Sequence, residues 1–317
     1  MSRNNNIQVS ELKQDWDQTK VLPNSYTESM PDLQNGLYNP TYQINHVGCH
    51  NFHAPLRVLQ RDGGWQEVVA TITGTVSLEA DKKGINMSRI FRTFTKNMED
   101  TFSIDRLCKI LQEYKKELNS FNSHINIHFP YRIWQPALST PNEGGWQYYD
   151  IGFDIDLNEN GEFYKVMSVK FVYSSACPCS TALSEHAAYE IGEYGIPHSQ
   201  RSVMDIQVVF DKVIWIEDIV NLAQQILVTE TQVFVKRQDE GYFALLNGSH
   251  TKFVEDAVRL IADGLMKIPD KVEDFRLVAS HMESLHSHNA IAILTKGMPG
   301  SRFSNYVSHE ELDALIR

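Results

Sequence analysis

Hydrophobic and polar residues alternate along several stretches of the chain, and this period of two predicts β-strands. The clearest stretch covers residues 65–79, where Val68, Ala70 and Ile72 share one side and threonines occupy the other. Similar alternation extends over residues 123–134, 146–157, 162–175, 200–211, 274–281 and 288–295. Residues 85–94 follow a turn at Lys83 and Gly84, and we expect them to form a strand that pairs with residues 65–79.

A period close to 3.6 predicts helices over residues 103–119, 216–229 and 251–266. Ser103 is suited to cap the first of these helices. The elements then follow the order β-β-α-β-β and β-β-α-α-β-β, and a Ser/Arg pair begins the second predicted strand of each half. We interpret this order as an internal duplication and expect an α+β fold, with antiparallel sheets and helices on one face.

The expected organisation has three parts. Residues 1–50 are polar, contain three prolines and lack a period, so we expect an extended N-terminal arm. Residues 51–160 form the first folded unit, and residues 161–317 form the second, which carries most of the candidate chemistry.

A loose cluster in the arm is either a metal site or scattered surface histidines, and its spacing fits no tight zinc pattern. Its members are His46, Cys49, His50 and His53.

Composition narrows the function classes. The chain has 317 residues and a net charge of -11, which argues against a nucleic-acid-binding protein with a broad basic surface. A local basic pocket for a phosphorylated small molecule stays possible. The first residues are polar and no stretch is apolar enough to span a membrane, so we expect a cytoplasmic protein. The four cysteines are therefore expected as thiols or ligands, with Cys108 on the apolar side of a helix.

Two residues with metal-ligand side chains lie where predicted strands end. Cys177 follows the strand over residues 162–175, and His198 precedes the strand over residues 200–211. We expect Cys177 to bind a metal and Cys179 to lie nearby, because two ligands so close in sequence would strain a tetrahedral site. His186 is a rival to His198 as the nitrogen ligand. A Cys, His and Glu set leaves an open position for water, as catalytic zinc sites do.

Three further clusters have both a structural and a functional interpretation. The run of residues 236–240 is either a solvated charge run or a source of one carboxylate ligand and cations for phosphate. Glu255 lies early in a predicted helix, where a carboxylate also suits the helix dipole. Glu283, His286 and His288 fall where one predicted strand ends and the next begins, either in a solvated turn or as acid–base groups.

Taken together, these motifs resemble those of the type IB GTP cyclohydrolase family, in order and in spacing. The resemblance covers residues 50–296. The segments that carry it are residues 175–180, 198–202, 236–240, 253–256 and 283–288, with residues 84–89 in the first half.

The resemblance implies tandem tunnelling-fold (T-fold) modules and a homotetramer with active sites at subunit interfaces. It implies conversion of GTP and water to 7,8-dihydroneopterin triphosphate and formate, the first step of pterin and tetrahydrofolate biosynthesis. It also implies a divalent metal (zinc, manganese or iron) without an organic cofactor, and neither a nucleic acid nor a membrane as partner. By motif, Cys177, His198 and Glu240 match the metal ligands, and Glu255 matches the carboxylate that anchors guanine.

The same match makes Cys177 a catalytic residue and assigns acid–base roles to Glu283, His286 and His288. Cations are needed for the triphosphate, and the candidates are Lys236, Arg237, Arg201 and Arg89, with Arg89 either from the same subunit or from another. The chain departs from the commoner family pattern between Cys177 and His198, where residues 187–195 make the segment longer. The alternatives are another purine or pterin enzyme of this fold, resembling a nitrile reductase, and a non-catalytic scaffold stabilised by a metal.

Overall fold

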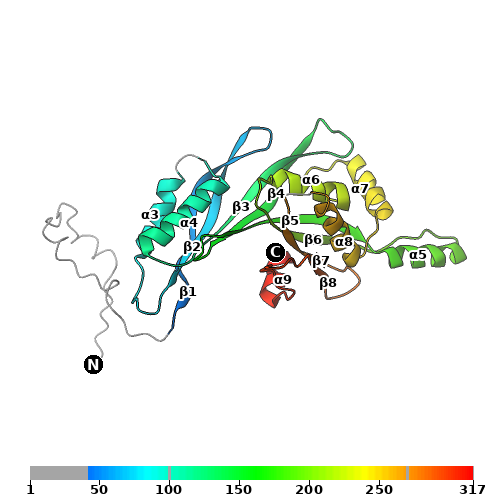
Figure 1. Cartoon of the computed structure of the whole chain (residues 1–317). Helices are drawn as coiled ribbons and strands as arrows, with labels where there is room; N and C mark the ends of the chain where they lie inside the picture. The colour runs from blue at the N-terminus through cyan, green and yellow to red at the C-terminus, as the bar shows by residue number, and fades with distance from the viewer. Residues whose placement is uncertain (1–41, 99–100, 269–270, 317) are drawn as a thin grey trace, which may run out of the picture.

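The computed structural model describes residues 42–98, 101–268 and 271–316. Its strands form one eight-stranded antiparallel sheet in which spatial order follows chain order from β1 to β8 (Figure 1). The strands are β1 (Ile44–Leu59), β2 (Trp65–Leu78), β3 (Ser123–Pro136), β4 (Gly144–Leu157), β5 (Phe163–Ala176), β6 (Ser199–Val209), β7 (Asp274–His281) and β8 (Ala290–Thr295). An α+β fold built on antiparallel strands is thus confirmed.

The described residues form seven helices. They are α3 (Met87–Asn97), α4 (Ile104–Leu118), α5 (Pro178–Ile191), α6 (Ile216–Leu227), α7 (Arg237–Ser249), α8 (Val254–Leu265) and α9 (His309–Ile316). None of them is long and apolar enough to cross a membrane. Helices α3 and α4 cover the sheet at the β1–β4 end and α6 and α8 at the β5–β8 end, whereas α5 projects from the body (Figure 1).

The main core lies between the sheet and α3, α4, α6 and α8. Neighbouring residues in a strand point to opposite faces, so Leu277 of β7 joins this core while Val278 faces the other side. On that other side Val278 packs with Val307 and with Leu315 of α9. The expectation of helices on one face is therefore correct for the main helices and wrong for α9, which lies on the face that the others leave open.

Local sequence explains where the predictions held. In β2, Ala70, Ile72 and Val76 are fully buried, as the alternation predicted. Helix α4 begins after Ser103, whose hydroxyl accepts a hydrogen bond from the Arg106 backbone N–H at 3.3 Å, so the predicted cap is confirmed.

Several segments differ from expectation. The expected strand over residues 85–94 is wrong, because this segment enters helix α3 and buries Ile90, Thr93 and Phe94 at helical spacing. Helices α5 and α7 occupy segments for which no helix was expected. Strand β1 takes in residues 44–50 of the expected arm, including His46, Cys49 and His50, while residues 1–41 of the arm lie outside the described residues.

Candidate functional site

Cys177 and His198 lie side by side at the end of two paired strands. Ala176, the last residue of β5, pairs with Ser199, the first of β6, and the Cys177 backbone N–H donates to the His198 carbonyl at 3.2 Å. Cys177 also occupies the N-cap position of α5, without a side-chain capping bond, and the first residue of the helix is Pro178, at a position where a missing N–H costs nothing. The main chain therefore holds the two predicted ligands together, whereas His186 lies exposed along α5.

The orientation of the His198 ring follows from its neighbours. Its Nδ1 lies 3.1 Å from Gln200 Oε1 and 3.7 Å from Glu283 Oε2. The Gln200 amide nitrogen donates to Ser175 Oγ at 2.9 Å, so the amide oxygen faces His198 and must accept from Nδ1–H. In the neutral tautomer that donates from Nδ1 to Gln200, the half-buried His198 ring leaves Nε2 available as an acceptor, the arrangement common in histidines that bind metals.

The three candidate acid–base residues after β7 are not in equivalent places. Glu283 is half-buried beside His198, and Gln200 Nε2 lies 3.5 Å from its Oε1. His286 and His288 are exposed, and their rings stack with centroids 4.7 Å apart. The structure thus brings Glu283 to the Cys177–His198 pair and leaves both histidines in the turn between β7 and β8.

A buried polar network lies beneath this pair. His281, only 2% exposed, has Nε2 at 2.8 Å from Tyr173 Oη and Nδ1 at 3.2 Å from Ser175 Oγ. Ser175 Oγ also lies 2.8 Å from Ser202 Oγ. The sequence analysis missed this network. The sequence contained a sign of the network. Polar residues occupy the buried register near the ends of otherwise apolar strands, and they are Ser175, Ser202 and His281.

A buried lysine adjoins the network. Lys252 is 6% exposed, its backbone N–H donates to the Ala176 carbonyl at 3.2 Å, and its ammonium donates to the His250 carbonyl at 2.6 Å. Burial lowers the pKa of Lys252 to about 8. Burial, together with the charge on Lys252, lowers the pKa of His281 to about 4. His281 is therefore neutral at physiological pH.

We predict that His281 makes the fold sensitive to acid. Its pKa in the folded protein lies below the ordinary value of 6.5, so the unfolded chain binds the extra proton and stability falls as the pH drops from about 6.5 through 4. The full loss is about 3 kcal/mol. Urea unfolding across this range should show a shallower loss for His281→Gln than for the wild type. Parallel pH profiles for the two proteins would contradict the prediction.

The charge run at residues 236–240 forms the start of α7. Asp239 is fully buried and accepts hydrogen bonds from the Lys236 N–H at 2.7 Å and the Ser139 N–H at 2.6 Å, which lower the pKa of its carboxyl. Lys236 forms an ion pair with Glu143, and the side chains of Arg237 and Glu240 are exposed. Asp239 is therefore the structural acid of this run, and Glu240 is free to face a ligand.

The remaining candidates are spread over the molecule. Glu255 is exposed in the first turn of α8, and Arg201 is exposed on β6. Arg89 is half-buried on α3, where its guanidinium donates to the Glu117 carbonyl at 2.5 Å. Figure 1 places α3 at the opposite end of the molecule from α5, so one chain does not bring Arg89 to Cys177.

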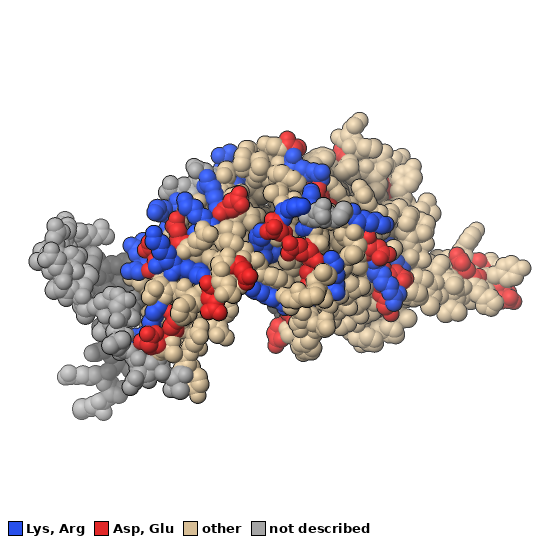
Figure 2. Space-filling view, viewed as in Figure 1, with Lys and Arg blue, Asp and Glu red and all other residues tan. Residues whose placement is uncertain are grey.

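Basic residues are concentrated near Arg89. Figure 2 shows many lysines and arginines over the end that carries α3 and α4, while the charged residues visible on the projecting α5 are acidic. Helix α3 has no acidic residue in its sequence, and α5 has neither lysine nor arginine. Arg89 and its basic neighbours thus lie far from the Cys177–His198 pair of the same chain, whereas Arg201, Lys236 and Arg237 lie in the same half as that pair.

Two places have side chains suited to a metal. Cys177 and His198 offer a sulfur and an imidazole nitrogen, which are ligand types that fit a zinc-like ion. Among the described residues, however, the compact group of three potential ligands is His124, Asp154 and Asp156. Glu240 does not form such a group with Cys177 and His198 within the described chain. The His/Asp/Asp group is consistent with binding of a divalent cation.

Known proteins resemble this chain over most of its length. The family model described as type I GTP cyclohydrolase folE2 matches residues 30–292. GTP cyclohydrolase FolE2 of Cereibacter sphaeroides (strain ATCC 17029 / ATH 2.4.9) is 44% identical over 293 residues, which cover 90% of this chain and 81% of that protein. GTP cyclohydrolase FolE2 of Paracoccus denitrificans (strain Pd 1222) is 46% identical over 301 residues, which cover 93% and 90%.

A solved structure has a similar fold. Uricase from Arthrobacter globiformis superposes with a TM-score of 0.50 at 7% sequence identity, covering 84% of this chain and 97% of that one. At this identity the similarity concerns the fold alone. The sequence relationships are much stronger, and by them the chain belongs to the type I GTP cyclohydrolase folE2 family.

Proposed function

We propose that this protein is a GTP cyclohydrolase, which converts GTP and water into 7,8-dihydroneopterin triphosphate and formate. The observation that carries the proposal is the 44–46% identity to proteins named GTP cyclohydrolase FolE2 over nearly the whole chain. The product carries the pterin ring system, so the reaction opens pterin and tetrahydrofolate biosynthesis.

Cys177 and His198 are proposed to hold a divalent metal, with Glu240 as the third ligand. The main-chain pairing of Cys177 with His198 and the hydrogen bond from His198 Nδ1 to Gln200 support the first two assignments. A zinc, manganese or iron ion held there would act as a Lewis acid and activate the attacking water near neutral pH. The exposed side chain of Glu240, at the start of α7, is accessible to complete the site.

Other residues of the chain are proposed to bind the substrate and move protons. Guanine presents N1–H and an exocyclic amine side by side, and the carboxylate of Glu255 would accept both. Glu283, supported by its place beside His198, would exchange protons at the reacting ring, with His286 and His288 entering from the turn. Four cations would bind the triphosphate, and these are Lys236, Arg237, Arg201 and Arg89.

We further propose that the chain contains two T-fold modules, residues 51–160 and 161–317, and assembles into a homotetramer. The element orders β1-β2-α3-α4-β3-β4 and β5-β6-α6-α8-β7-β8 support the duplication once the added α5 and α7 are set aside. The superposition on uricase supports the fold. The distance of Arg89 from Cys177 within one chain is consistent with a site completed at a subunit interface.

The proposed function is tested by incubating metal-loaded protein with GTP. Formate and a pterin that fluoresces after oxidation should accumulate together in equal amounts. Protein loaded separately with zinc, manganese and iron should be compared, since the site does not select among them by ligand type alone. Failure to release either product with all of these metals would overturn the proposal.

We predict that Glu255→Gln mainly weakens GTP binding. The amide of glutamine has only one acceptor oxygen, so the paired hydrogen bonds to guanine are lost and KM should rise about 10- to 100-fold. Steady-state kinetics separate this effect from a change in kcat. Asp263→Asn, an exposed change near the other end of α8, is the matched control and should leave KM unchanged. An unaltered KM in Glu255→Gln would count against the anchoring role.

A further inference from the structure

The face of the sheet opposite α3, α4, α6 and α8 carries a group of polar side chains on β3 and β4. His124 pairs directly across the strands with Asp156, and Asn126 pairs with Asp154. Their neighbours Ile125 and Ile155 point into the main core, so alternation directs these polar side chains to the opposite face. We propose that His124, Asp154 and Asp156 form a divalent-cation site of their own, separate from the Cys177–His198 pair.

The geometry fits a small ion. One potential ligand atom from each residue lies within 4.8 Å of the others, and all three side chains are half-buried. His124 Nε2 lies 3.2 Å from Asp154 Oδ1, and the Asn126 amide donates to Asp154 Oδ2 at 2.9 Å. One imidazole and two carboxylates favour a divalent transition metal such as manganese or zinc, and rigid strands hold all three ligands.

A second layer of contacts fixes the histidine. His124 Nδ1 lies 3.5 Å from Thr75 Oγ1, and the same hydroxyl lies 3.1 Å from His46 Nδ1. The rings of His46 and His124 meet edge to face with centroids 5.4 Å apart. Contacts of this kind orient ligating histidines in metal sites and leave the other nitrogen, here Nε2, toward the ion.

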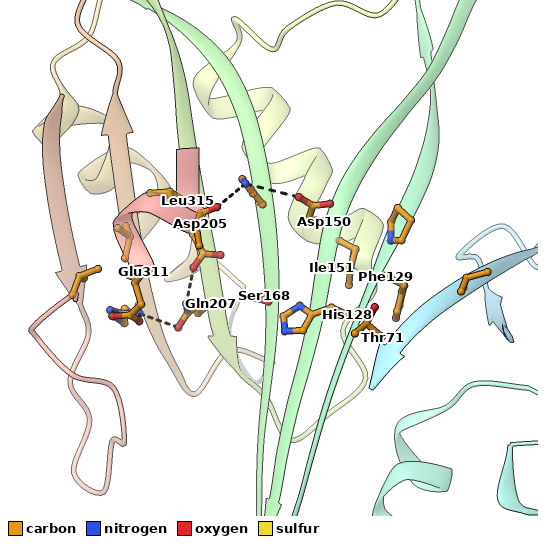
Figure 3. Close-up of a pocket in the computed structure, with 17 residues that line it drawn as sticks. Thr71, His128, Phe129, Asp150, Ile151, Ser168, Asp205, Gln207, Glu311 and Leu315 are labelled. Atoms are coloured by element: carbon orange, nitrogen blue, oxygen red, sulfur yellow. Dashed lines mark hydrogen bonds and ion pairs between the residues drawn. The ribbon is translucent and has the colours of Figure 1, made fainter. Parts of the chain in front are cut away.

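The site borders a cavity through which an ion could enter. A hollow of about 290 Å³ is lined by Asp154, Asp156 and residues of β5 and β6. It shares His128, Ser168 and Gln207 with a neighbouring cavity of about 510 Å³ that extends beneath α9. Figure 3 shows this second cavity, with His128 and Ser168 on the sheet and Glu311 and Leu315 of α9 across from it.

Arg302 balances the charge of Asp156 in the described structure. Its guanidinium donates to Asp156 Oδ2 at 2.9 Å and lies over the ring of Tyr164 at 4.4 Å. Arg302 comes from the segment between β8 and α9, so it balances the carboxylates without being part of the sheet. A cation that binds Asp156 must compete with this ion pair. Removing the Arg302–Asp156 ion pair should therefore strengthen ion binding, whereas removing the ligand carboxylates should abolish it.

The test is the metal content of the full-length protein after dialysis against excess Mn²⁺ and removal of free ion. We expect two ions per chain in the wild type and one in Asp154→Asn/Asp156→Asn. Cys177→Ala should also lose one ion, but a different one, so combining all three changes should leave none. This readout is independent of turnover, so failure of the proposed enzymatic function would not affect it. If the double variant retains as much Mn²⁺ as the wild type, the inference is wrong.

A titration followed by electron paramagnetic resonance of free Mn²⁺ gives the affinity of the site. The comparison belongs on the Cys177→Ala background, where ion binding reports the His124 site alone. Arg302→Ala should bind Mn²⁺ about tenfold more tightly, because a competing charge at a partly exposed position is gone. Asp150→Asn, on the same strand and face but outside the triad, should bind as the background does. Weaker binding by Arg302→Ala, or loss of binding in Asp150→Asn, would overturn the inference.

Discussion

Replacing Cys177 with alanine is expected to lower kcat for GTP by at least about a thousandfold, since metal activation of water contributes several kcal/mol. The methyl group cannot coordinate an ion, and His198 alone would hold it weakly. The fold should be unaffected, because the backbone pairing of Cys177 with His198 does not involve the thiol. Turnover should be measured together with bound metal, and both should fall.

Cys179→Ala is the matched control, because it changes the same chemical group two residues away. Cys179 is exposed on the first turn of α5, whereas Cys177 lies at the strand end beside His198. The change should alter kcat by less than about threefold, as surface substitutions away from a site do. An equal loss of metal and turnover in both variants would mean that Cys179 is a ligand.

Glu283→Gln is expected to lower kcat about 10²- to 10⁴-fold, the usual contribution of a general acid–base group. Glutamine has nearly the same shape but cannot carry the proton. Glu283 is the carboxylate that the structure places against His198, at 3.7 Å between Oε2 and Nδ1. Rapid-mixing or steady-state assays with GTP should show the loss in kcat, with bound metal unchanged.

The control for Glu283 lies at the opposite end of the same strand. Glu273 immediately precedes β7 and is exposed, so Glu273→Gln changes the same charge far from the site and should leave kcat unaltered. A parallel loss of bound metal in Glu283→Gln would assign Glu283 to the metal and not to proton transfer. An unchanged kcat would remove it from the mechanism.

The regular elements were predictable where burial follows a single period. Strand β2 and helix α8 each bury one side, and their sequences record that side directly. Helix α3 was misassigned because its apolar residues are not confined to its buried side. Met87 is 46% exposed and Phe91 is 47% exposed, so they obscured the helical spacing of Ile90 and Phe94.

Helix α7 was missed for a related reason. Its only buried residues are Asp239 and Asn247, so it has no apolar stripe to reveal its period. The local signal was the acid at its third position, since Asp239 accepts a hydrogen bond from the Lys236 backbone. A buried acid in a charge run looks identical, in sequence, to a solvated one.

The candidate site was predictable where strand pairing alone positions the residues. Cys177 and His198 flank paired strands, so their contact follows from topology. No such rule relates Glu240 or Arg89 to Cys177, because α7 meets β5 only through helix packing and α3 lies at the opposite end of the molecule. The network around His281 could be suspected from polar residues in buried register, but its hydrogen bonds depend on three strands meeting.

The strictly sequential order of the sheet also bears on how the protein folds. Three connections between neighbouring strands are short, spanning residues 60–64, 137–143 and 158–162, and such hairpins form fast because little loop entropy is lost. Residues 79–122 and 210–273, by contrast, separate β2 from β3 and β6 from β7. The β2–β3 and β6–β7 pairings each require the closure of a long connection that contains helices. These two pairings should therefore be the slowest steps in assembly of the sheet.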